Sequence, residues 1–446
     1  MFGSKKDRER QARMQRLLDR DQGIMPEEPV PTGQFPPIPG IRPTRHVDRE
    51  EAEPRPQARV KSLSALQKKQ RRRKHVLLAV LGLVAAVAVA GVTGALGTSI
   101  AMLGDAVDSI YLSLNPSGGG FPADTGISQP LRIEELAGGF VELGAEDAAV
   151  YSGRGAKIRA FQPGYARPAL AVGNTRFCVY NRAGTELRVE SRTKNLYTKN
   201  FENGILLCAM SNNGSLAVVT QSNRYAAEVT VYDPLFRQKY LYSPTQTDGT
   251  PVSLSFAADN HRFAVGCLSA RDGRLATNIF FMDTNADTIG ATYAATAGST
   301  VLEMHWLSST RVLAVFDNYA AIINPSDGAE AARFEYNGNT LKGISVSGKN
   351  TAFLLSGRSG SVLDLRDDSL GRLAQVIVGQ AEAVDCTATA VYVLSTSTIR
   401  EYKFDGICNW EQSYENRPLR VLDAAKTLLF SGTTAELLVA PVTTSR

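Results

Sequence analysis

EVTVYDPLFRQKYLYS, residues 228–243, contains two short runs of β-branched and aromatic residues separated by a turn that begins at Asp233. Two apolar runs joined by a short stretch of turn-forming residues are typical of a β-hairpin. The preceding stretch, ILLCAMSNNGSLAVVT at residues 205–220, has the same form. Together the two stretches predict four consecutive antiparallel strands within about 40 residues.

This pattern recurs along the chain at a spacing of about 40 to 50 residues. Further copies are NIFFMDTNADTIGATYAA, NYAAIINPSDGAEAARFEY, GSVLDLRDDSLGRLAQVIV and TIREYKFDGICNWEQSY. The turns of the five copies are expected at Asp233, Asp283, Asn324, Asp364 and Asp405. The same period extends back to Ser152 and Ser191 and forward to about Ala440. Four strands per repeat are the signature of a β-propeller blade, so we predict an all-β propeller.

The count of repeats predicts eight blades. The last repeat, from Arg420 to Val442, has room for only three strands, so we expect sequence near Phe121 to Ser128 to supply the fourth and close the ring. A seven-bladed ring and a pair of β-sandwiches are the alternatives. Helical pattern is almost absent after Leu131, which argues against an α/β enzyme fold.

The run from Val76 to Leu103 contains no ionisable side chain and consists mostly of Ala, Val, Leu, Gly and Ile. About 20 apolar residues suffice for a helix to cross the hydrocarbon core of a bilayer. A cleaved signal peptide is the alternative, but signal peptides lie at the extreme N-terminus and have shorter apolar cores. We therefore expect residues 75–103 to form a single uncleaved transmembrane helix.

Six cationic residues directly precede this apolar run: Lys68, Lys69, Arg71, Arg72, Arg73 and Lys74. Positive residues beside a transmembrane helix remain on the cytoplasmic side. The six cationic residues and the apolar run therefore predict a single-pass plasma-membrane protein. Its N-terminus is expected in the cytoplasm, its C-terminal domain outside the cytoplasm, and its helix in contact with membrane lipid. Residues 1–74 carry a net charge of +9, which leaves −4 for the remaining chain and gives no indication of nucleic-acid binding.

The sequence therefore divides into four parts. Residues 1–74 form a basic, Pro-rich tail that we expect to be disordered, either as a spacer or as a docking arm for a cytoplasmic partner. The expected transmembrane helix at 75–103 is followed by a membrane-proximal linker at 104–120. Residues 121–446 form the expected extracytoplasmic propeller.

Three segments resemble a known family: GGGFPAD (118–124), GYARPALAVGNTRFCVYNRAGTELRVES (164–191) and MSNNGSLAVVTQSNRYAAEVTVYD (210–233). The chain resembles a domain-of-unknown-function family of bacterial single-span membrane proteins with an extracytoplasmic β-propeller, best over residues 120–324. The resemblance implies surface localisation and a propeller, and it supplies no catalytic residues. The blades are more distantly similar to quinoprotein-type and WD-type propellers, although the signature motifs of both are missing.

The sequence offers little catalytic or metal-binding chemistry. His261 and His305 are the histidines of the expected propeller, and their separation does not fit a metal site. Asp283, Asn285 and Asp287 alternate as in a calcium loop, but the acidic residue that would close such a loop is absent. No nucleophile elbow, metalloprotease motif, phosphate-binding loop or dinucleotide fingerprint is present. We predict no metal and no cofactor, and the sequence nominates no catalytic residue.

The chain has five cysteines: Cys178, Cys208, Cys267, Cys386 and Cys408. Their number is odd, and no two of them form a CxxC motif. Most of them lie within apolar strand segments, where a thiol behaves as a small apolar side chain. We expect buried free thiols rather than a disulfide framework, so strand pairing and blade packing must stabilise the ring.

Two functions from different classes fit this sequence. The favoured one is a non-enzymatic binding or scaffold module, because a propeller presents variable loops on a stiff frame to a protein, a peptide or an envelope polymer. The alternative is an extracellular glycan hydrolase or lyase, which needs two carboxyl groups about 5 to 9.5 Å apart in the channel. Acids gathered at one channel mouth would favour the enzyme, and acids scattered around the outer turns would favour the scaffold.

Overall fold

The computed structural model describes residues 104–105, 108, 120–424 and 426–441 of the 446-residue chain. The chain divides into a unit of residues 1–78, outside this part, and a unit of residues 79–446 that contains it. The expected transmembrane helix and the six cationic residues before it, Lys68, Lys69, Arg71, Arg72, Arg73 and Lys74, also lie outside the described residues. In the described part, no helix is long and apolar enough to cross a membrane.

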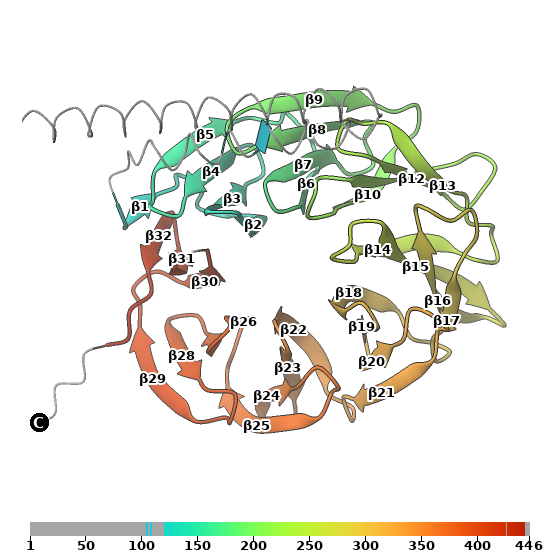
Figure 1. The fold of residues 1–446 in the computed structure, drawn as a ribbon. Helices are drawn as coiled ribbons and strands as arrows, with labels where there is room; N and C mark the ends of the chain where they lie inside the picture. Colours follow the sequence, from blue (N-terminus) through green and yellow to red (C-terminus); the bar gives the residue numbers. More distant parts are fainter. Residues whose placement is uncertain (1–103, 106–107, 109–119, 425, 442–446) are drawn as a thin grey trace, which may run out of the picture. The chain divides into compact units, whose positions relative to one another are not determined.

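The described strands form eight antiparallel sheets of four strands each, and each sheet is one blade of a β-propeller (Figure 1). Blade 1 contains β2 (Arg132–Leu136), β3 (Gly139–Leu143), β4 (Ala148–Ser152) and β5 (Lys157–Phe161). Blade 2 contains β6 (Pro168–Val172), β7 (Arg176–Asn181), β8 (Glu186–Ser191) and β9 (Asn195–Asn200). Blade 3 contains β10 (Ile205–Met210), β11 (Leu216–Thr220), β12 (Glu228–Tyr232) and β13 (Gln238–Tyr242). Blade 4 contains β14 (Thr250–Phe256), β15 (Arg262–Arg271), β16 (Arg274–Asp283) and β17 (Ala291–Ala294).

The second half of the ring repeats this arrangement. Blade 5 contains β18 (Val301–Ser308), β19 (Arg311–Phe316), β20 (Tyr319–Ile323) and β21 (Glu330–Glu335). Blade 6 contains β22 (Thr340–Ser347), β23 (Asn350–Gly357), β24 (Gly360–Arg366) and β25 (Arg372–Gly379). Blade 7 contains β26 (Ala383–Cys386), β27 (Val391–Leu394), β28 (Thr398–Tyr402) and β29 (Cys408–Ser413). Blade 8 contains β30 (Pro418–Asp423), β31 (Thr427–Ser431), β32 (Thr434–Leu437) and β1 (Ala123–Asp124).

Blade 8 joins the two ends of the propeller sequence and closes the ring. β1 pairs with β32 in antiparallel fashion, and Ala123 lies opposite Ala435. Next to this pair, the backbone N–H and the hydroxyl group of Thr125 both donate to the carbonyl oxygen of Thr433, at 2.8 and 3.0 Å. The predicted count of eight blades and the predicted closure by residues near Phe121 to Ser128 are both confirmed. A seven-bladed ring and a pair of sandwiches are excluded.

The core consists of apolar clusters between neighbouring blades. Between blades 8 and 1, Phe140 stacks on Tyr151 with ring centroids 5.0 Å apart, and Phe430 packs edge-on against Phe140. Between blades 4 and 5, Phe316 stacks on Tyr319 at 4.4 Å. A buried cluster of the same kind joins each of the other six pairs of neighbouring blades. Middle strands such as β11 are buried along their whole length, because a blade lies on each side of them.

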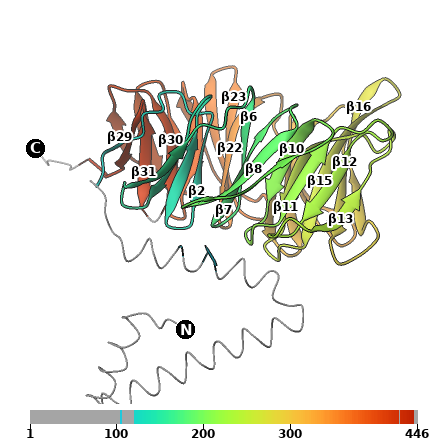
Figure 2. The same cartoon turned by 90° about the horizontal axis from the view of Figure 1, so that it is seen from above.

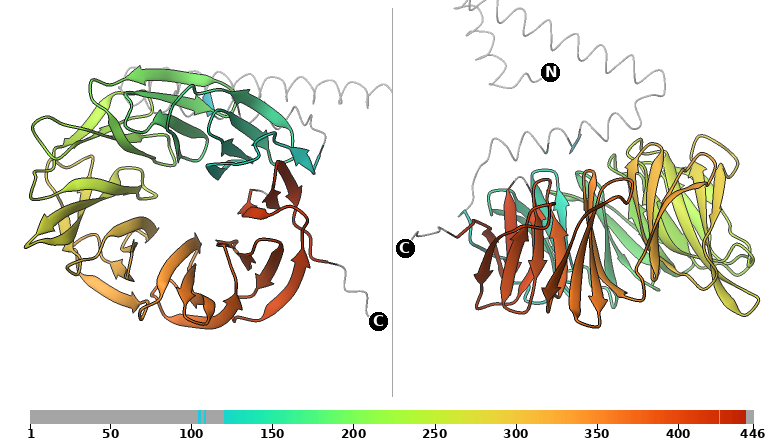
Figure 3. Two further views of the ribbon diagram at one scale, coloured as in Figure 1. Left: turned by 180° about the vertical axis from the view of Figure 1, so that it is seen from behind. Right: turned by 90° about the horizontal axis from the view of Figure 1, so that it is seen from below.

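The ring has two ends, which Figures 2 and 3 show from the side. We call distal the end that carries the loops before the first strand and between the second and third strands of each blade. In blade 2 these loops are residues 164–167 and 182–185. The proximal end carries the loops between the first and second and between the third and fourth strands. In blade 2 these are residues 173–175 and 192–194.

Two residues of the expected linker, Asp105 and Asp108, contact the proximal end of blade 2. The carboxylate of Asp105 pairs with the guanidinium group of Arg176 at 2.9 Å and accepts the hydroxyl group of Thr175 at 2.9 Å. The side chains of Asp105 and Arg176 are only 14% and 6% exposed. Asp108 accepts the hydroxyl group of Thr193 at 2.8 Å. Asp105 and Asp108 are therefore attached to the proximal end of the propeller.

The five cysteines are all free thiols. Cys178 and Cys267 are buried, and Cys208 and Cys386 are partly buried, as their apolar strand context predicts. Cys408 is exposed, so the expectation of burial is wrong for this residue. It begins β29, the outermost strand of blade 7, which has one face toward solvent.

Candidate binding site

The predicted turn residues Asp233, Asp283, Asn324 and Asp405 lie at proximal turns between the third and fourth strands of their blades. In each turn, the Oδ1 atom of this residue accepts the backbone N–H two positions further along the chain, at 2.8 to 3.1 Å. Such a hydrogen bond mimics a backbone turn and favours Asp or Asn at its first position. These residues therefore recur for a structural reason, and they sit on four different blades rather than in one cluster.

Asp364 is the exception, because it lies inside β24 and the turn of blade 6 begins three residues later, at Asp367. Asp364 is fully buried, pairs with the guanidinium group of Arg366 and accepts the side-chain amide of Gln375 at 3.0 Å. The strand continues past Asp364 because Leu365 on its other face belongs to the core between blades 6 and 7. The predicted turn position at Asp364 is therefore wrong.

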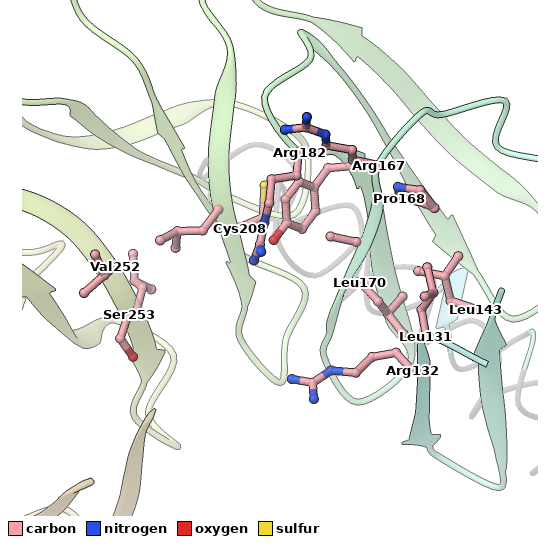
Figure 4. Close-up of a pocket in the computed structure, with 14 residues that line it drawn as sticks. Leu131, Arg132, Leu143, Arg167, Pro168, Leu170, Arg182, Cys208, Val252 and Ser253 are labelled. Atoms are coloured by element: carbon pink, nitrogen blue, oxygen red, sulfur yellow. The ribbon is translucent and has the colours of Figure 1, made fainter. Parts of the chain in front are cut away.

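A cavity of about 560 Å³ opens on the central channel toward the distal end. Its lining comes from the first four blades and is shown in Figure 4. We call it the arginine pocket, defined by Arg132, Arg167, Arg182, Leu131, Leu170, Leu207, Val252 and Leu254. The lining also contains Pro168, Ala169, Tyr180, Leu143, Cys208 and Ser253. None of the lining residues is acidic.

Blade 2 supplies two of the three arginines from loops that are tied together. The backbone N–H of Arg182 donates to the carbonyl oxygen of Arg167 at 2.9 Å, and the N–H of Arg167 donates to Asn181 Oδ1 at 3.2 Å. Both arginines are exposed, and within residues 120–424 and 426–441 neither guanidinium group has a carboxylate within salt-bridge distance. Arg132 of β2 lies 3.5 Å from Glu134 and is 58% exposed. The pocket thus has an excess of positive charge.

The rest of the pocket lining is uncharged. The inner strands β6, β10 and β14 contain no charged residue, and they contribute Leu170, Leu207 and Leu254. Leu131 and Val252 are 54% and 39% exposed, which is unusual for large apolar side chains inside a channel. Burial also raises the pKa of the Cys208 thiol, which keeps this side of the pocket uncharged near neutral pH.

Acidic side chains enter the channel from blades 1, 5 and 7. The inner strands β2, β18 and β26 carry Glu134, Glu303 and Asp385. Glu134 lies 3.9 Å from Arg420 of β30, and Arg420 lies 3.5 Å from Asp385, so the ion pairs cross three successive blades. Because Glu134 also contacts Arg132, this network begins at the edge of the arginine pocket.

The other contacts of these acidic side chains are with hydrogen-bond donors. Asp385 accepts the backbone N–H of Val421 at 2.8 Å, and burial raises the pKa of its carboxyl group. Glu303 lies 3.1 Å from the ring of His305, and this hydrogen bond lowers the pKa of Glu303. Each of the three carboxyl groups thus already has a basic partner, which is typical of a structural ion-pair network.

Sequence reasoning missed the arginines of the pocket. Arg132 is the first residue of the inner strand β2, and Arg167 directly precedes β6, the inner strand of the next blade. Arg182 directly follows β7, the strand that forms a hairpin with β6. Arg132 and Arg167 therefore occupy nearly equivalent positions in neighbouring blades. Their convergence on one cavity is a property of the ring, and no local motif carries it.

The fold and this pocket define the class of the protein as an eight-bladed β-propeller with a channel pocket at its distal end. The chain belongs to the family of unknown function DUF5711, whose model matches residues 123–435, from β1 to β32. This membership confirms the predicted resemblance to a family of unknown function over the propeller. A comparison with curated proteins found no match.

Solved structures similar to this chain are β-propellers of low sequence identity. BamB from Moraxella catarrhalis is 13% identical, with a TM-score of 0.50, over 72% of this chain and 99% of that chain. The C-terminal WD40 domain of Sif2 is 12% identical, with a TM-score of 0.50, over 72% and 99%. The computationally designed protein Ika8 is 10% identical, with a TM-score of 0.53, over 72% and 100%. At these identities the likeness concerns the fold.

Proposed function

We propose that this protein is a non-enzymatic binding or scaffold module whose distal end receives a protein partner. The arginine pocket is the observation that carries the proposal. It is concave, two of its three arginines, Arg167 and Arg182, lack a carboxylate partner in the described part of the chain, and it exposes apolar side chains beside them. Pockets that combine apolar walls with a few placed polar groups are typical binding sites.

The ion-pair network in the channel favours binding over glycan hydrolysis. A glycosidase needs one carboxyl group that donates a proton and a second that attacks or activates water. Glu134 and Asp385 share Arg420, and Glu303 is bonded to His305, so each of these three carboxyl groups is engaged by a basic side chain. These contacts stabilise neighbouring inner strands against one another.

We further propose that the propeller is anchored outside the plasma membrane. The support is the apolar run at 76–103 together with the six cationic residues directly before it. The N-terminal tail would then lie in the cytoplasm, where its Pro-rich segment could contact a second partner.

Site-specific photocrosslinking in intact cells tests the binding function. A photoreactive phenylalanine analogue at Leu170 should crosslink a protein partner, whereas the same analogue at the exposed Ile377 on the outer strand β25 should not. The adducts are identified by mass spectrometry after purification through a C-terminal tag. Equal adducts from both positions, or adducts only with an envelope polymer, would contradict a protein partner at the pocket.

Thiol labelling in intact cells tests the topology. Cys408 is exposed, so a membrane-impermeant maleimide should label it without permeabilisation if the propeller lies outside. A Ser64→Cys variant in a Cys408→Ser background should be labelled only after permeabilisation. Labelling of the Ser64→Cys variant in intact cells would contradict the proposed orientation and would place the N-terminal tail outside the cell.

A further inference from the structure

We propose that the arginine pocket binds an acidic peptide segment in which carboxylate side chains alternate with apolar ones. This inference rests on the proposed function, and it names the chemistry of the segment that the partner inserts. Three features of the pocket carry it: the arginines, the apolar strands that face them, and the acids deeper in the channel.

The arginines select for carboxylates. A guanidinium group binds a carboxylate through two parallel hydrogen bonds, and such a charge-assisted pair is stronger than a neutral hydrogen bond. Arg167 and Arg182 come from adjacent loops of blade 2 that share a backbone hydrogen bond of 2.9 Å, so their positions are coupled. Arg132 extends the cationic edge to blade 1. A cationic or neutral segment would leave the guanidinium groups of Arg167 and Arg182 without a carboxylate partner.

The facing strands select for apolar side chains. Leu131 of blade 1 and Val252 of blade 4 are both exposed, at 54% and 39%, and Leu170 of blade 2 and Leu207 of blade 3 line the pocket between them. Covering this surface removes apolar area from water at about 25 cal/mol per Å². A ligand without apolar groups would gain nothing from this side of the pocket.

The size of the pocket fits a short extended segment rather than a folded surface. A volume of about 560 Å³ lies within the range of small-ligand pockets and holds only a few residues of a peptide. In an extended chain, successive side chains point to opposite sides. Alternation of carboxylate and apolar residues therefore directs one set toward the arginines of blades 1 and 2 and the other toward Leu207, Val252 and Leu254 of blades 3 and 4.

The channel acids argue against a continuous polyanion. Glu134 pairs with Arg132 at the edge of the pocket, and Asp385 follows two blades further around the ring. A polymer with a negative charge on every unit would meet these carboxylates as it passed into the channel, whereas a peptide with a few acidic residues would not.

Fluorescence anisotropy with the purified full-length chain and defined peptides tests this inference. The probes are fluorescein-labelled heptapeptides that alternate Leu with Glu, Leu with Gln or Leu with Lys, and a heptaglutamate. We expect the Leu–Glu peptide to bind at least tenfold more tightly than each of the others, a difference of about 1.4 kcal/mol. We also expect the affinity for the Leu–Glu peptide to decrease as the ionic strength increases.

Two double variants separate the pocket from general charge effects. Arg167→Gln with Arg182→Gln should weaken binding of the Leu–Glu peptide at least tenfold. Arg224→Gln with Arg358→Gln changes the charge equally, at distal loops of blades 3 and 6 outside the pocket, and should leave binding unchanged. Circular dichroism spectra of both variants check that the propeller remains folded.

The outcomes distinguish this inference from the proposed function. Equal binding of the Leu–Glu and Leu–Gln peptides, or equal loss in both double variants, would overturn the acidic-peptide inference. Tighter binding of heptaglutamate would overturn it in favour of a polyanion. If no peptide binds while Leu170 still crosslinks a protein in cells, the inference fails and the proposed binding function stands.

Discussion

Glu142 is a buried carboxyl group beneath the strand that closes the ring. It lies in β3, is 2% exposed and forms a hydrogen bond with Thr125, while its Oε2 atom has no partner in the described residues. The hydroxyl group of Tyr151 donates to the carbonyl oxygens of Asp124 and Thr125 at 3.3 Å, beside the same seam. Burial raises the pKa of Glu142 from 4.5 to about 7, although nearby Lys157 opposes the change.

The direction of this change determines how stability depends on pH. In the unfolded chain the carboxyl group loses its proton near pH 4.5, whereas the folded protein retains it until about pH 7. Between these values the folded state binds more protons, so the free energy of unfolding decreases as pH rises and is level above this window. Each pKa unit is worth about 1.4 kcal/mol, so the loss amounts to roughly 3 kcal/mol.

The variant Glu142→Gln keeps the shape of the side chain and removes its titration. Urea unfolding of both proteins at pH 5 and pH 8, followed by circular dichroism, gives the difference in unfolding free energy at each pH. Because part of the loss has already occurred by pH 5, we expect the variant to gain roughly 2.5 kcal/mol relative to wild type between pH 5 and pH 8. Other titrating groups cancel in this comparison, and Glu146→Gln, an exposed position in the same blade, should show no such gain. Parallel pH profiles for wild type and Glu142→Gln would refute the reasoning.

Three further perturbations test the packing, the surface and the proximal attachment. Gly139→Ala would place a methyl group against a backbone carbonyl of β4 and should cost about 3 kcal/mol in urea unfolding, whereas Gly343→Ala, which has room, should cost less than about 0.5 kcal/mol. The native protein should react rapidly with one equivalent of a thiol reagent, and Cys408→Ser should abolish this phase while the denatured chain of that variant still reacts with four. Asp105→Ala removes the carboxylate partner of the buried Arg176 and should lower the free energy of unfolding by about 3 kcal/mol, with Asp105→Asn less damaging.

The sequence predicts the blades because their turns are chemically distinct. An Asp or Asn that accepts the backbone N–H two residues later marks the proximal turns at Asp233, Asp283, Asn324 and Asp405. In blade 6 three aspartates occur within five residues, and only burial of the neighbouring Leu365 decides that Asp364 belongs to the strand. Turn chemistry therefore predicts where blades repeat, but it does not fix the position of a turn when several residues could begin it.

The pocket could not be predicted in this way, because its residues share no local pattern. Arg132, Arg167 and Arg182 are ordinary loop and strand-end residues in the sequence. They meet only because the ring brings the distal ends of blades 1 and 2 together, opposite uncharged strands of blades 3 and 4. The same dependence on the ring explains the error at Cys408, since burial of an outer strand depends on what lies outside the blade.

If the protein is anchored in the membrane as proposed, the contacts of Asp105 also constrain which ligands can reach the pocket. Asp105 binds Arg176 at the first residue of β7, whereas Arg182, just beyond the last residue of the same strand, lines the pocket. At about 3.3 Å per residue, the strand separates the two sites by roughly 20 Å. In the proposed anchored protein only Gly104 stands between the apolar run and Asp105, so the pocket would open away from the bilayer, beyond the reach of lipid headgroups. A photocrosslinker at Leu170 should therefore form adducts with protein and none with anionic lipid, and recovery of lipid adducts would contradict this orientation.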